Sequence, residues 1–285
     1  MKYIPRKYAE KWSNYELIDA GGGKKLERFG QIITIRPELQ AYFRSELPFT
    51  EWNTMAHAEF IEPNIGTKKG KWKKMKPELA DSWTIPVEGL NIKLEFTQYK
   101  HIGIFPEQIE NWRFIRENLQ EGQNFLNLFA YTGIASLVAR KTGANVTHVD
   151  SVKQLLSWSK ENMELSQLSD VKWVLEDALK FAQREVKRGN KYEGIIMDPP
   201  AYGIGSKGEK WILEQQLPIL LETANLLLAK NGFLIVNTYS PKITAEVLLQ
   251  TAQKAFKGKT VKVEELWMNS TSEKEVLYGN TLLVK

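Results

Sequence analysis

Residues 124–150 read NFLNLFAYTGIASLVARKTGANVTHVD, and the fold class follows from this stretch. An apolar run at 124–129 is typical of a strand, and a helical segment at 134–141 follows it. A second apolar run at 146–149 ends at Asp150. Strand, helix and strand in this order predict a β-α-β unit, in which both strands lie parallel in one sheet.

The same alternation continues toward the end of the chain. Helices are expected at 107–118, where Pro106 opens the first turn, and at 152–165, 178–187 and 211–229; strands are expected at 171–175, 194–197 and 232–237. Two candidate strands, 260–267 and 280–284, flank the polar residues 269–275 and predict an antiparallel hairpin at the end of the sheet. The pattern predicts the α/β class, with a Rossmann-like, mostly parallel sheet covered by helices on both faces.

The front of the chain has a different texture. QIITIR at 31–36 is β-rich, and the segments 83–87 and 91–96 alternate polar and apolar residues around a turn, which predicts a hairpin. An aromatic core is expected here from Trp12, Trp52, Trp72 and Trp83. We therefore predict a small β-rich N-terminal domain at 1–98, a candidate module for binding substrate or RNA, and the α/β domain at 99–285.

Composition excludes several classes of protein. The 285 residues are 42% apolar and 26% charged, contain no long apolar run, and do not begin like a secretion signal, so a cytoplasmic protein without membrane helices is expected. There is no cysteine, which excludes disulfides, thiolate metal sites and a cysteine nucleophile. The three histidines fit no zinc motif, so no metal is expected. The net charge of +5 permits an anionic partner without requiring one.

Acidic residues follow the predicted strands. Asp150 and Asp198 each stand directly after a strand, and the strand at 171–175 ends at Glu176 and Asp177; an open parallel sheet binds its ligands at such strand ends. Asp150 is placed to accept the hydrogens of a ribose diol, and Asp177 those of an adenine amino group. For each carboxylate alone, a helix N-cap or first-turn acid is the better explanation, but the agreement of successive strand ends favours a nucleoside ligand.

The residues DPPAY at 198–202 form a distinctive turn. Pro199 and Pro200 have fixed φ and no N–H group, so the turn is rigid and presents carbonyl acceptors. Asp198 and such a carbonyl could hold a planar amino group while Tyr202 stacks on the ring, which would aim a nitrogen lone pair at a methyl donor. We assign catalysis to Asp198, Pro199 and Tyr202; the alternative is a structural turn beside a core tyrosine.

Four motifs in these places resemble class I S-adenosylmethionine-dependent methyltransferases. They are NLFAYTG at 127–133, HVDS at 148–151, EDALKF at 176–181 and DPPAYG at 198–203. The resemblance is strongest to the group that contains bacterial large-subunit ribosomal RNA cytosine-5 methyltransferases, and KHIGIFPEQ at 100–108 is similar to the segment that precedes the fold in that group. The resemblance covers about residues 99–285 and, more weakly, the β-rich front, and it implies S-adenosylmethionine as cofactor.

The resemblance also implies residue roles. Phe129, Tyr131 and Gly133 would line the methionine part of the cofactor, Asp150 would hold the ribose, and Ser151 would lie beside the adenine. Asp177 would bind the adenine amino group, Asp198 would lie near the methionine ammonium and the target base, and Gln108 would close the pocket. Asn127 and Thr132 belong to the same first motif and complete the expected cofactor-binding set.

The chain departs from that group in three respects. Cytosine-5 methylation needs a cysteine, which this chain lacks, so that chemistry is excluded and a nitrogen or oxygen acceptor is expected. The front does not resemble the PUA RNA-binding module of the cytosine-5 enzymes. In the amino-methyltransferase pattern an aromatic residue directly follows the second proline, whereas here Ala201 intervenes before Tyr202.

A lysine-rich segment suggests an RNA partner. It comprises Lys68, Lys69, Lys71, Trp72, Lys73, Lys74 and Lys76. Lysines neutralise phosphates and a tryptophan stacks on unpaired bases, although a solvated loop with Trp72 in the core explains the pattern equally well. Together with the resemblance, the segment makes RNA, and ribosomal RNA first, the expected substrate.

Two other classes of function stay open. A nicotinamide-dependent oxidoreductase would need a glycine-rich first turn, and of G-x-G-x-x-G only Gly133 is present. An RNA-binding protein on a methyltransferase-like scaffold would bind RNA without transferring a methyl group.

Overall fold

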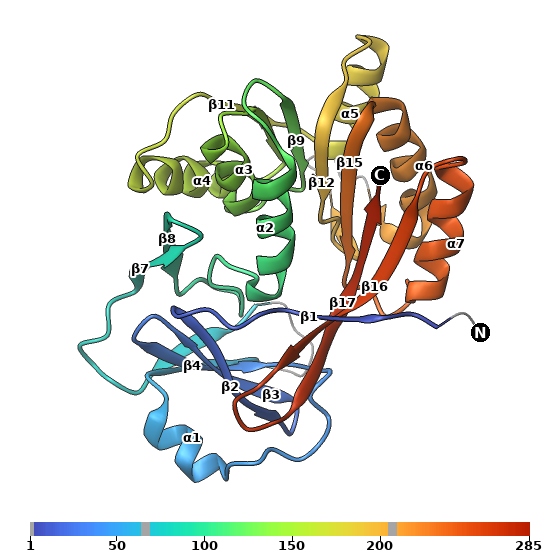
Figure 1. Cartoon of the computed structure of the whole chain (residues 1–285). Helices are drawn as coiled ribbons and strands as arrows, with labels where there is room; N and C mark the ends of the chain where they lie inside the picture. The colour runs from blue at the N-terminus through green and yellow to red at the C-terminus, as the bar shows by residue number, and fades with distance from the viewer. Residues whose placement is uncertain (1–2, 64–68, 205–209) are drawn as a thin grey trace. The chain divides into compact units, whose positions relative to one another are not determined.

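The computed structural model describes residues 3–63, 69–204 and 210–285 (Figure 1). The chain forms two compact units. The larger unit is drawn from Met1–Lys7, Glu110–Leu266 and Gly279–Lys285, and the smaller unit from Tyr8–Ile109 and Trp267–Tyr278. No helix of the described residues is long and apolar enough to cross a membrane. The domain boundary between residues 98 and 99 stays a prediction.

The larger unit is built on an eight-stranded sheet. Its strand order is β1 (Arg6–Tyr8), β16 (Val261–Asn269), β17 (Glu275–Val284), β15 (Leu228–Thr238), β12 (Tyr192–Met197), β9 (Asn124–Leu128), β10 (Asn145–Asp150) and β11 (Val171–Leu175). The five strands from β15 to β11 run parallel, and β17 is antiparallel to β15. The predicted α/β class, with its antiparallel C-terminal strands, is confirmed.

Helices cover both faces of this sheet because its central strands are apolar on both sides. On one face α3 (Ile134–Lys141) and α4 (Lys153–Leu165) contact β9, β10 and β11, and α2 (Ile109–Asn118) packs its Phe114 against Phe233 of β15. On the other face lie α5 (Ala178–Lys187), α6 (Leu213–Leu227) and α7 (Ala245–Ala255).

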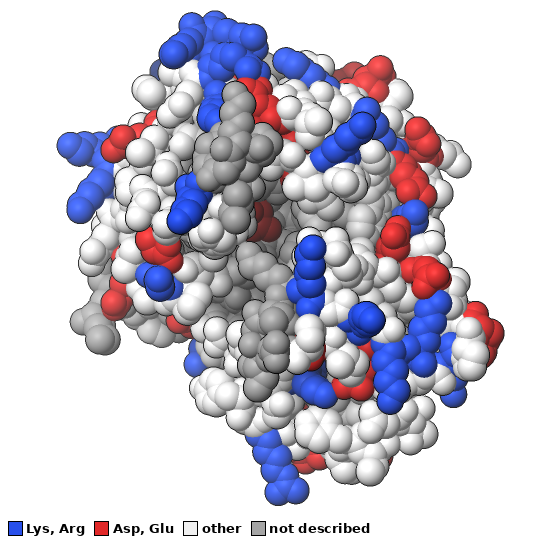
Figure 2. Space-filling model, turned by 180° about the vertical axis from the view of Figure 1, so that it is seen from behind, with Lys and Arg blue, Asp and Glu red and all other residues white. Residues whose placement is uncertain are grey.

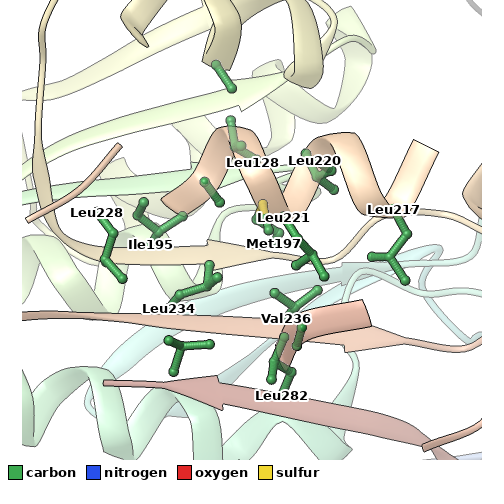
Figure 3. Close-up of a cluster of buried hydrophobic side chains, with 14 of the residues drawn as sticks. Leu128, Ile195, Met197, Leu217, Leu220, Leu221, Leu228, Leu234, Val236 and Leu282 are labelled. Carbon is green, nitrogen blue, oxygen red and sulfur yellow. The ribbon is translucent and has the colours of Figure 1, made fainter. Parts of the chain in front are cut away.

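Alternate side chains of the strands fill the second of these interfaces. Figure 3 shows side chains of β9, β12, β15 and β17 meeting leucines of α6. They include Leu128, Ile195, Met197, Val236 and Leu282 from the strands. Burial of this apolar surface is the main stabilising contribution of the larger unit.

Several predicted bounds were wrong. The helix expected at 211–229 begins only at Leu213, because Lys210–Ile212 forms strand β14, which pairs with β13 (Tyr202–Ile204). Helix α7 was not predicted. The C-terminal hairpin does not end the sheet, because β1 pairs outside it. Apolar content alone does not distinguish the first turn of a helix from a short strand.

The smaller unit is β-rich, as predicted. One sheet has the order β2 (Tyr15–Gly21), β3 (Lys24–Phe29), β4 (Ile32–Pro37), β5 (Ala58–Ile61) and β6 (Lys71–Lys74). The predicted hairpin is β7 (Ser82–Val87) and β8 (Leu90–Glu95), joined by Glu88 and Gly89, both at positive φ. Helix α1 (Phe49–Met55), which was not predicted, contributes the fully buried Trp52 to the core, and η1 (Pro106–Gln108) is a 3₁₀ turn.

Gly194 of β12 provides a test of the sheet's packing. A Cβ at this position would lie 2.7 Å from the ring of Phe125 and 2.8 Å from that of Phe233. Both rings are buried, so we expect Gly194→Ala to lower the free energy of unfolding by about 1–3 kcal/mol. Urea denaturation followed by circular dichroism measures the change. Gly203→Ala is the control, because its nearest neighbour would be 3.6 Å away; equal midpoints for both variants would contradict the packing argument.

Candidate active site

The site lies where the order of the sheet reverses direction. The chain passes from β9 outward to β10 and β11, and then returns to place β12 on the other side of β9. In open parallel sheets ligands bind at the carboxyl ends of strands at such a reversal. The two strand ends meet here directly, since the N–H of Asp198 after β12 bonds to the carbonyl of Leu128 in β9, at 3.4 Å.

The turn after β9 has an unusual backbone. Phe129, Tyr131 and Gly133 have φ of 58°, 51° and 88°, all in the left-handed region. A Cβ on Gly133 would lie 3.1 Å from the Ser159 hydroxyl, so the position requires glycine for space as well as conformation. Gly133 directly precedes α3, and the turn therefore brings backbone groups and the positive end of this helix toward a ligand.

A buried hydrogen-bond network holds this turn from below. The hydroxyl of Ser159 in α4 bonds to the Tyr131 carbonyl at 2.8 Å, and the amide of Asn162 donates to the Thr132 carbonyl at 3.0 Å. On the α3 side, the amide of Asn127 donates to Ser136 at 3.0 Å. Side chains of α4 therefore hold the carbonyls of Tyr131 and Thr132 in the turn.

His148 joins the two sides of the network. Its Nδ1 lies 3.0 Å from the Ser136 hydroxyl and its Nε2 lies 3.5 Å from that of Ser159. Burial lowers the pKa of His148 to about 3, so the ring is neutral. A proton on Nε2 gives every group a partner: Ser136 donates to Nδ1, and Nε2 donates to Ser159, which in turn donates to Tyr131.

Asp150 connects the first turn to the second. Its carboxylate accepts the N–H of Tyr131 through Oδ2 and the N–H of Val152 through Oδ1, both at 2.9 Å. Burial raises the pKa of Asp150, and backbone N–H groups of Val152, Tyr131 and Ser151 oppose this shift. The carboxylate therefore binds both loops and retains acceptor capacity for a ligand hydroxyl.

The other predicted adenine-side residues are less distinctive. Ser151 is exposed. Asp177 is the N-cap of α5, and its carboxylate accepts the N–H of Lys180 at 2.8 Å. This is the helix-cap role that the sequence analysis gave as the alternative. Its neighbour Glu176 forms a two-pronged ion pair with Arg184. The adenine contacts of Ser151 and Asp177 stay predictions.

The turn after β12 is held by the hairpin that follows it. The carbonyl of Pro200 accepts the indole N–H of Trp211 at 2.7 Å, and the carbonyl of Ala201 accepts the N–H of Leu213 at 3.1 Å. Pro199 is buried, whereas 42% of Tyr202 is exposed. A 42% exposed tyrosine beside this turn is not a core residue, which argues against the purely structural interpretation.

The remaining predicted residues belong to the smaller unit. Gln108 is 4% exposed, and its role in closing the pocket stays a prediction. Trp72 packs against Phe60 and Phe96 and donates its indole N–H to the Tyr99 carbonyl at 3.3 Å. This half-buried side chain fits the core alternative better than base stacking.

The lysines of this segment differ in their surroundings. Lys74 is paired with Asp81 at 2.8 Å, whereas Lys71 and Lys73 are exposed on the edge strand β6. Lys69 and Lys76 are exposed as well, and Lys68 lies outside the described residues. Charged residues also protect edge strands from pairing with other chains, so their exposure alone does not indicate a partner.

Sequence reasoning missed five residues of the site. They are Ser136, His148, Ser159, Asn162 and Trp211. A signal existed for two of them, because Ser159 and Asn162 follow Leu156 at three-residue steps on the inward face of α4, where polar side chains need a buried partner. His148 stood inside a quoted motif without a role, and no local signal marks Trp211.

Comparison with known proteins identifies the family. The family model for S-adenosylmethionine-dependent methyltransferases matches residues 67–270, and the chain therefore belongs to this family. A crystal structure of the SAM-dependent methyltransferase from Agrobacterium tumefaciens is 32% identical, with a TM-score of 0.90, and the match covers 98% of this chain and 95% of that one. The sequence-based assignment to these methyltransferases is confirmed.

Two further similarities support weaker conclusions. The ribosomal RNA large subunit methyltransferase K/L of Shewanella frigidimarina is 32% identical over 163 residues, which are 56% of this chain but only 22% of that protein. The crystal structure of SMU.776 complexed with SAH has a TM-score of 0.78 at 18% identity, covering 97% of this chain and 76% of that one. The latter likeness is one of fold.

The residues of the site fit S-adenosylmethionine, the cofactor of the family. The left-handed turn ends at the N-terminus of α3, and the Asp150 carboxylate stands at the end of the next strand with acceptor capacity for a ribose diol. The pattern lacks the glycine-rich dinucleotide turn, and the family match favours the methyltransferase over the oxidoreductase alternative.

Replacing one oxygen of Asp150 tests its role. In Asp150→Asn the amide nitrogen would face the N–H of Tyr131 or Val152, so one charge-assisted hydrogen bond is lost and the first turn loosens. We expect the dissociation constant of S-adenosylhomocysteine to rise at least about tenfold, or about 1.4 kcal/mol, by isothermal titration. The control is Asp170→Asn, whose side chain is 77% exposed; equal affinities would contradict the assignment.

Proposed function

We propose that this protein transfers the methyl group of S-adenosylmethionine to a nitrogen or oxygen atom in RNA, with ribosomal RNA the favoured substrate. The observation that carries the proposal is the DPPAY turn at the carboxyl end of β12, beside the left-handed turn after β9. The matched segment spans only about a fifth of the length of the ribosomal RNA methyltransferases to which the chain is similar. Their substrate is therefore assigned to this chain as a proposal only. Its cytoplasmic location likewise stays a prediction.

A base nitrogen is the acceptor that suits this turn best. Asp198 would accept one hydrogen of an exocyclic amino group, and the Pro199 carbonyl would accept the other. The Pro200 carbonyl already accepts the indole of Trp211, which favours Pro199 for this role. Tyr202, half exposed at the start of β13, would stack on the base.

The chemistry then needs orientation more than acid–base strength. When bound, S-adenosylmethionine supplies a methyl group on a positively charged sulfur. Asp198 and Pro199 aim the nitrogen lone pair at that carbon, so the nitrogen–carbon bond forms as the sulfur–carbon bond breaks. The proton that the nitrogen loses passes to the Asp198 carboxylate and then to water. Cysteine-dependent methylation of carbon-5 is not available to a chain without cysteine.

Labelled cofactor tests the reaction directly. Ribosomal RNA from a strain that lacks the protein should accept labelled methyl groups, and Asp198→Asn should lower kcat by at least about a hundredfold, because the amide cannot take up the proton. Mass spectrometry of nucleosides from the deletion strain and its parent identifies the methylated atom. Asp170→Asn should retain full activity.

The outcomes separate the alternatives. A wild-type protein that binds S-adenosylhomocysteine but labels no RNA would contradict the proposed substrate. Binding of RNA with no methylated nucleoside in any strain would favour the non-enzymatic alternative, an RNA-binding protein on this scaffold.

The exposed lysines of β6 supply a second part of the proposal, contact with RNA phosphates. On the face seen in Figure 2, Lys and Arg are interleaved with Asp and Glu, so a broad basic face does not explain RNA binding there. Lys71 and Lys73 share one side of β6 and are exposed, and Lys69 and Lys76 flank them. The contacts of Trp72 with Phe96 and the Tyr99 carbonyl favour a packing role for its side chain, so the proposal does not use it.

Salt dependence measures this contribution. In the double variant Lys71→Ala/Lys73→Ala, we expect the slope of log Kd against log salt for single-stranded ribosomal RNA to fall by about 1.4, since each lost phosphate contact on single strands contributes about 0.7. Filter binding gives both slopes. The matched control is Lys254→Ala/Lys257→Ala, two exposed lysines at the end of α7; an equal loss there would show an unspecific charge effect.

A further inference from the structure

The turn after β12 lacks backbone hydrogen-bond donors because of its sequence. Its two prolines give rigidity but have no N–H group, so the turn cannot form the usual internal hydrogen bonds. Its carbonyl groups therefore depend on donors from elsewhere. If the turn presents acceptors to a substrate, these donors also determine where the acceptors lie.

Strand β14 and the first residue of α6 provide the donors. Trp211 donates its indole N–H to the Pro200 carbonyl at 2.7 Å, and two residues later the Leu213 N–H bonds to the Ala201 carbonyl at 3.1 Å. The pairing of β14 with β13 opposes Gly203 to Trp211 and Tyr202 to Ile212. The same segment of the chain thus holds the turn and also Tyr202, the residue that is proposed to stack on a base.

Trp211 also contacts the cofactor side of the site. Its ring packs on that of Phe129, with centroids 5.1 Å apart and planes at 55°. Phe129 is the first left-handed residue of the turn after β9, and both rings pack against the apolar core of the larger unit. One side chain therefore bonds to the turn after β12 and packs on the turn after β9.

We propose that Trp211 is a positioning residue that aligns the methyl acceptor with the methyl donor. The inference rests on the proposed methyltransferase activity and deepens it. The indole N–H sets the position of the D-P-P-A-Y turn, and the indole ring sets it relative to Phe129. Because an in-line transfer loses rate steeply when the reacting atoms are misplaced by a fraction of an ångström to an ångström, a residue that touches no substrate can still govern kcat.

Two substitutions separate the two contacts of Trp211. Trp211→Phe keeps an aromatic ring against Phe129 but removes the donor to Pro200. It should lower kcat about ten- to a hundredfold while the affinity for S-adenosylhomocysteine stays within about twofold of wild type. Trp211→Leu removes both contacts and should weaken S-adenosylhomocysteine binding as well.

Trp83→Phe is the matched control. Trp83 also donates its indole N–H to a backbone carbonyl, that of Phe29 at 3.1 Å, and also packs on a phenylalanine, Phe96 at 4.9 Å, but it lies in the smaller unit. It loses the same kind of hydrogen bond and should keep full kcat. An equal fall in kcat for Trp83→Phe and Trp211→Phe would overturn the proposal, because the effect would then be general destabilisation.

A second readout does not depend on activity or on an RNA substrate. Wild-type protein labelled with 5-fluorotryptophan gives one ¹⁹F resonance per tryptophan, and the variants assign those of Trp211 and Trp83. Addition of S-adenosylhomocysteine should shift the Trp211 resonance, through the Phe129 turn, and leave that of Trp83 in place. A stationary Trp211 resonance under saturating ligand would overturn the coupling, and Trp211→Leu assigns this resonance if Trp211→Phe fails to fold.

The outcomes also distinguish this inference from the proposed function. If the wild-type protein binds S-adenosylhomocysteine and its Trp211 resonance shifts, but it methylates no RNA, the proposed substrate is wrong and the coupling through Trp211 is still supported. A wild-type protein that methylates RNA while Trp211→Phe retains its kcat sinks the positioning role alone. A turnover rate for Trp211→Phe that rises to the wild-type value at high S-adenosylmethionine would also overturn it, because weaker cofactor binding would then explain the loss.

Discussion

The site depends on the bond between the Asp150 carboxylate and the backbone of the turn after β9. Phe129 and Tyr131 adopt left-handed conformations that side chains disfavour, so the turn needs external support to persist. Asp150 supplies it from the side through the Tyr131 N–H, and Ser159 supplies it from below through the Tyr131 carbonyl. The two polar groups of one peptide residue are thus fixed from β10 and from α4, and the ligand-facing backbone is set before any ligand binds.

The parallel sheet explains why part of this was predictable. Its central strands are buried on both faces and read as short apolar runs, and their carboxyl ends lie along one edge. Asp150 and Asp198 could therefore be identified from their places after two such runs. The same rule cannot assign Asp177, because a carboxylate between a strand and a helix is also in the capping position, and its bond to Lys180 shows that it caps α5.

The unpredicted parts depend on contacts between segments distant in sequence. His148 joins Ser136 to Ser159 only because α3 and α4 lie on the same face of the sheet. Trp211 was read as the start of a helix, since nothing in an apolar run marks where a three-residue strand ends. Helix α7 is a different case. Its N-cap Thr244, which accepts the N–H of Val247, is a residue type that marks helix starts in a sequence, but the helix was not predicted.

The proline pair links these observations to chemistry. A turn without its own donors has carbonyl groups to offer, and a substrate group that brings hydrogens is its natural complement; an exocyclic amino group does so, whereas an ionised oxygen does not. The turn can serve this way only if some carbonyls are held by the protein and others are left to the substrate. Trp211 bonds to the Pro200 carbonyl, and the proposal assigns the Pro199 carbonyl, next to Asp198, to the methyl acceptor. In the proposed reaction, the residue that secures the turn would therefore also determine which carbonyl acceptors the turn presents, so selectivity for a nitrogen nucleophile and alignment with the methyl donor would have one structural origin.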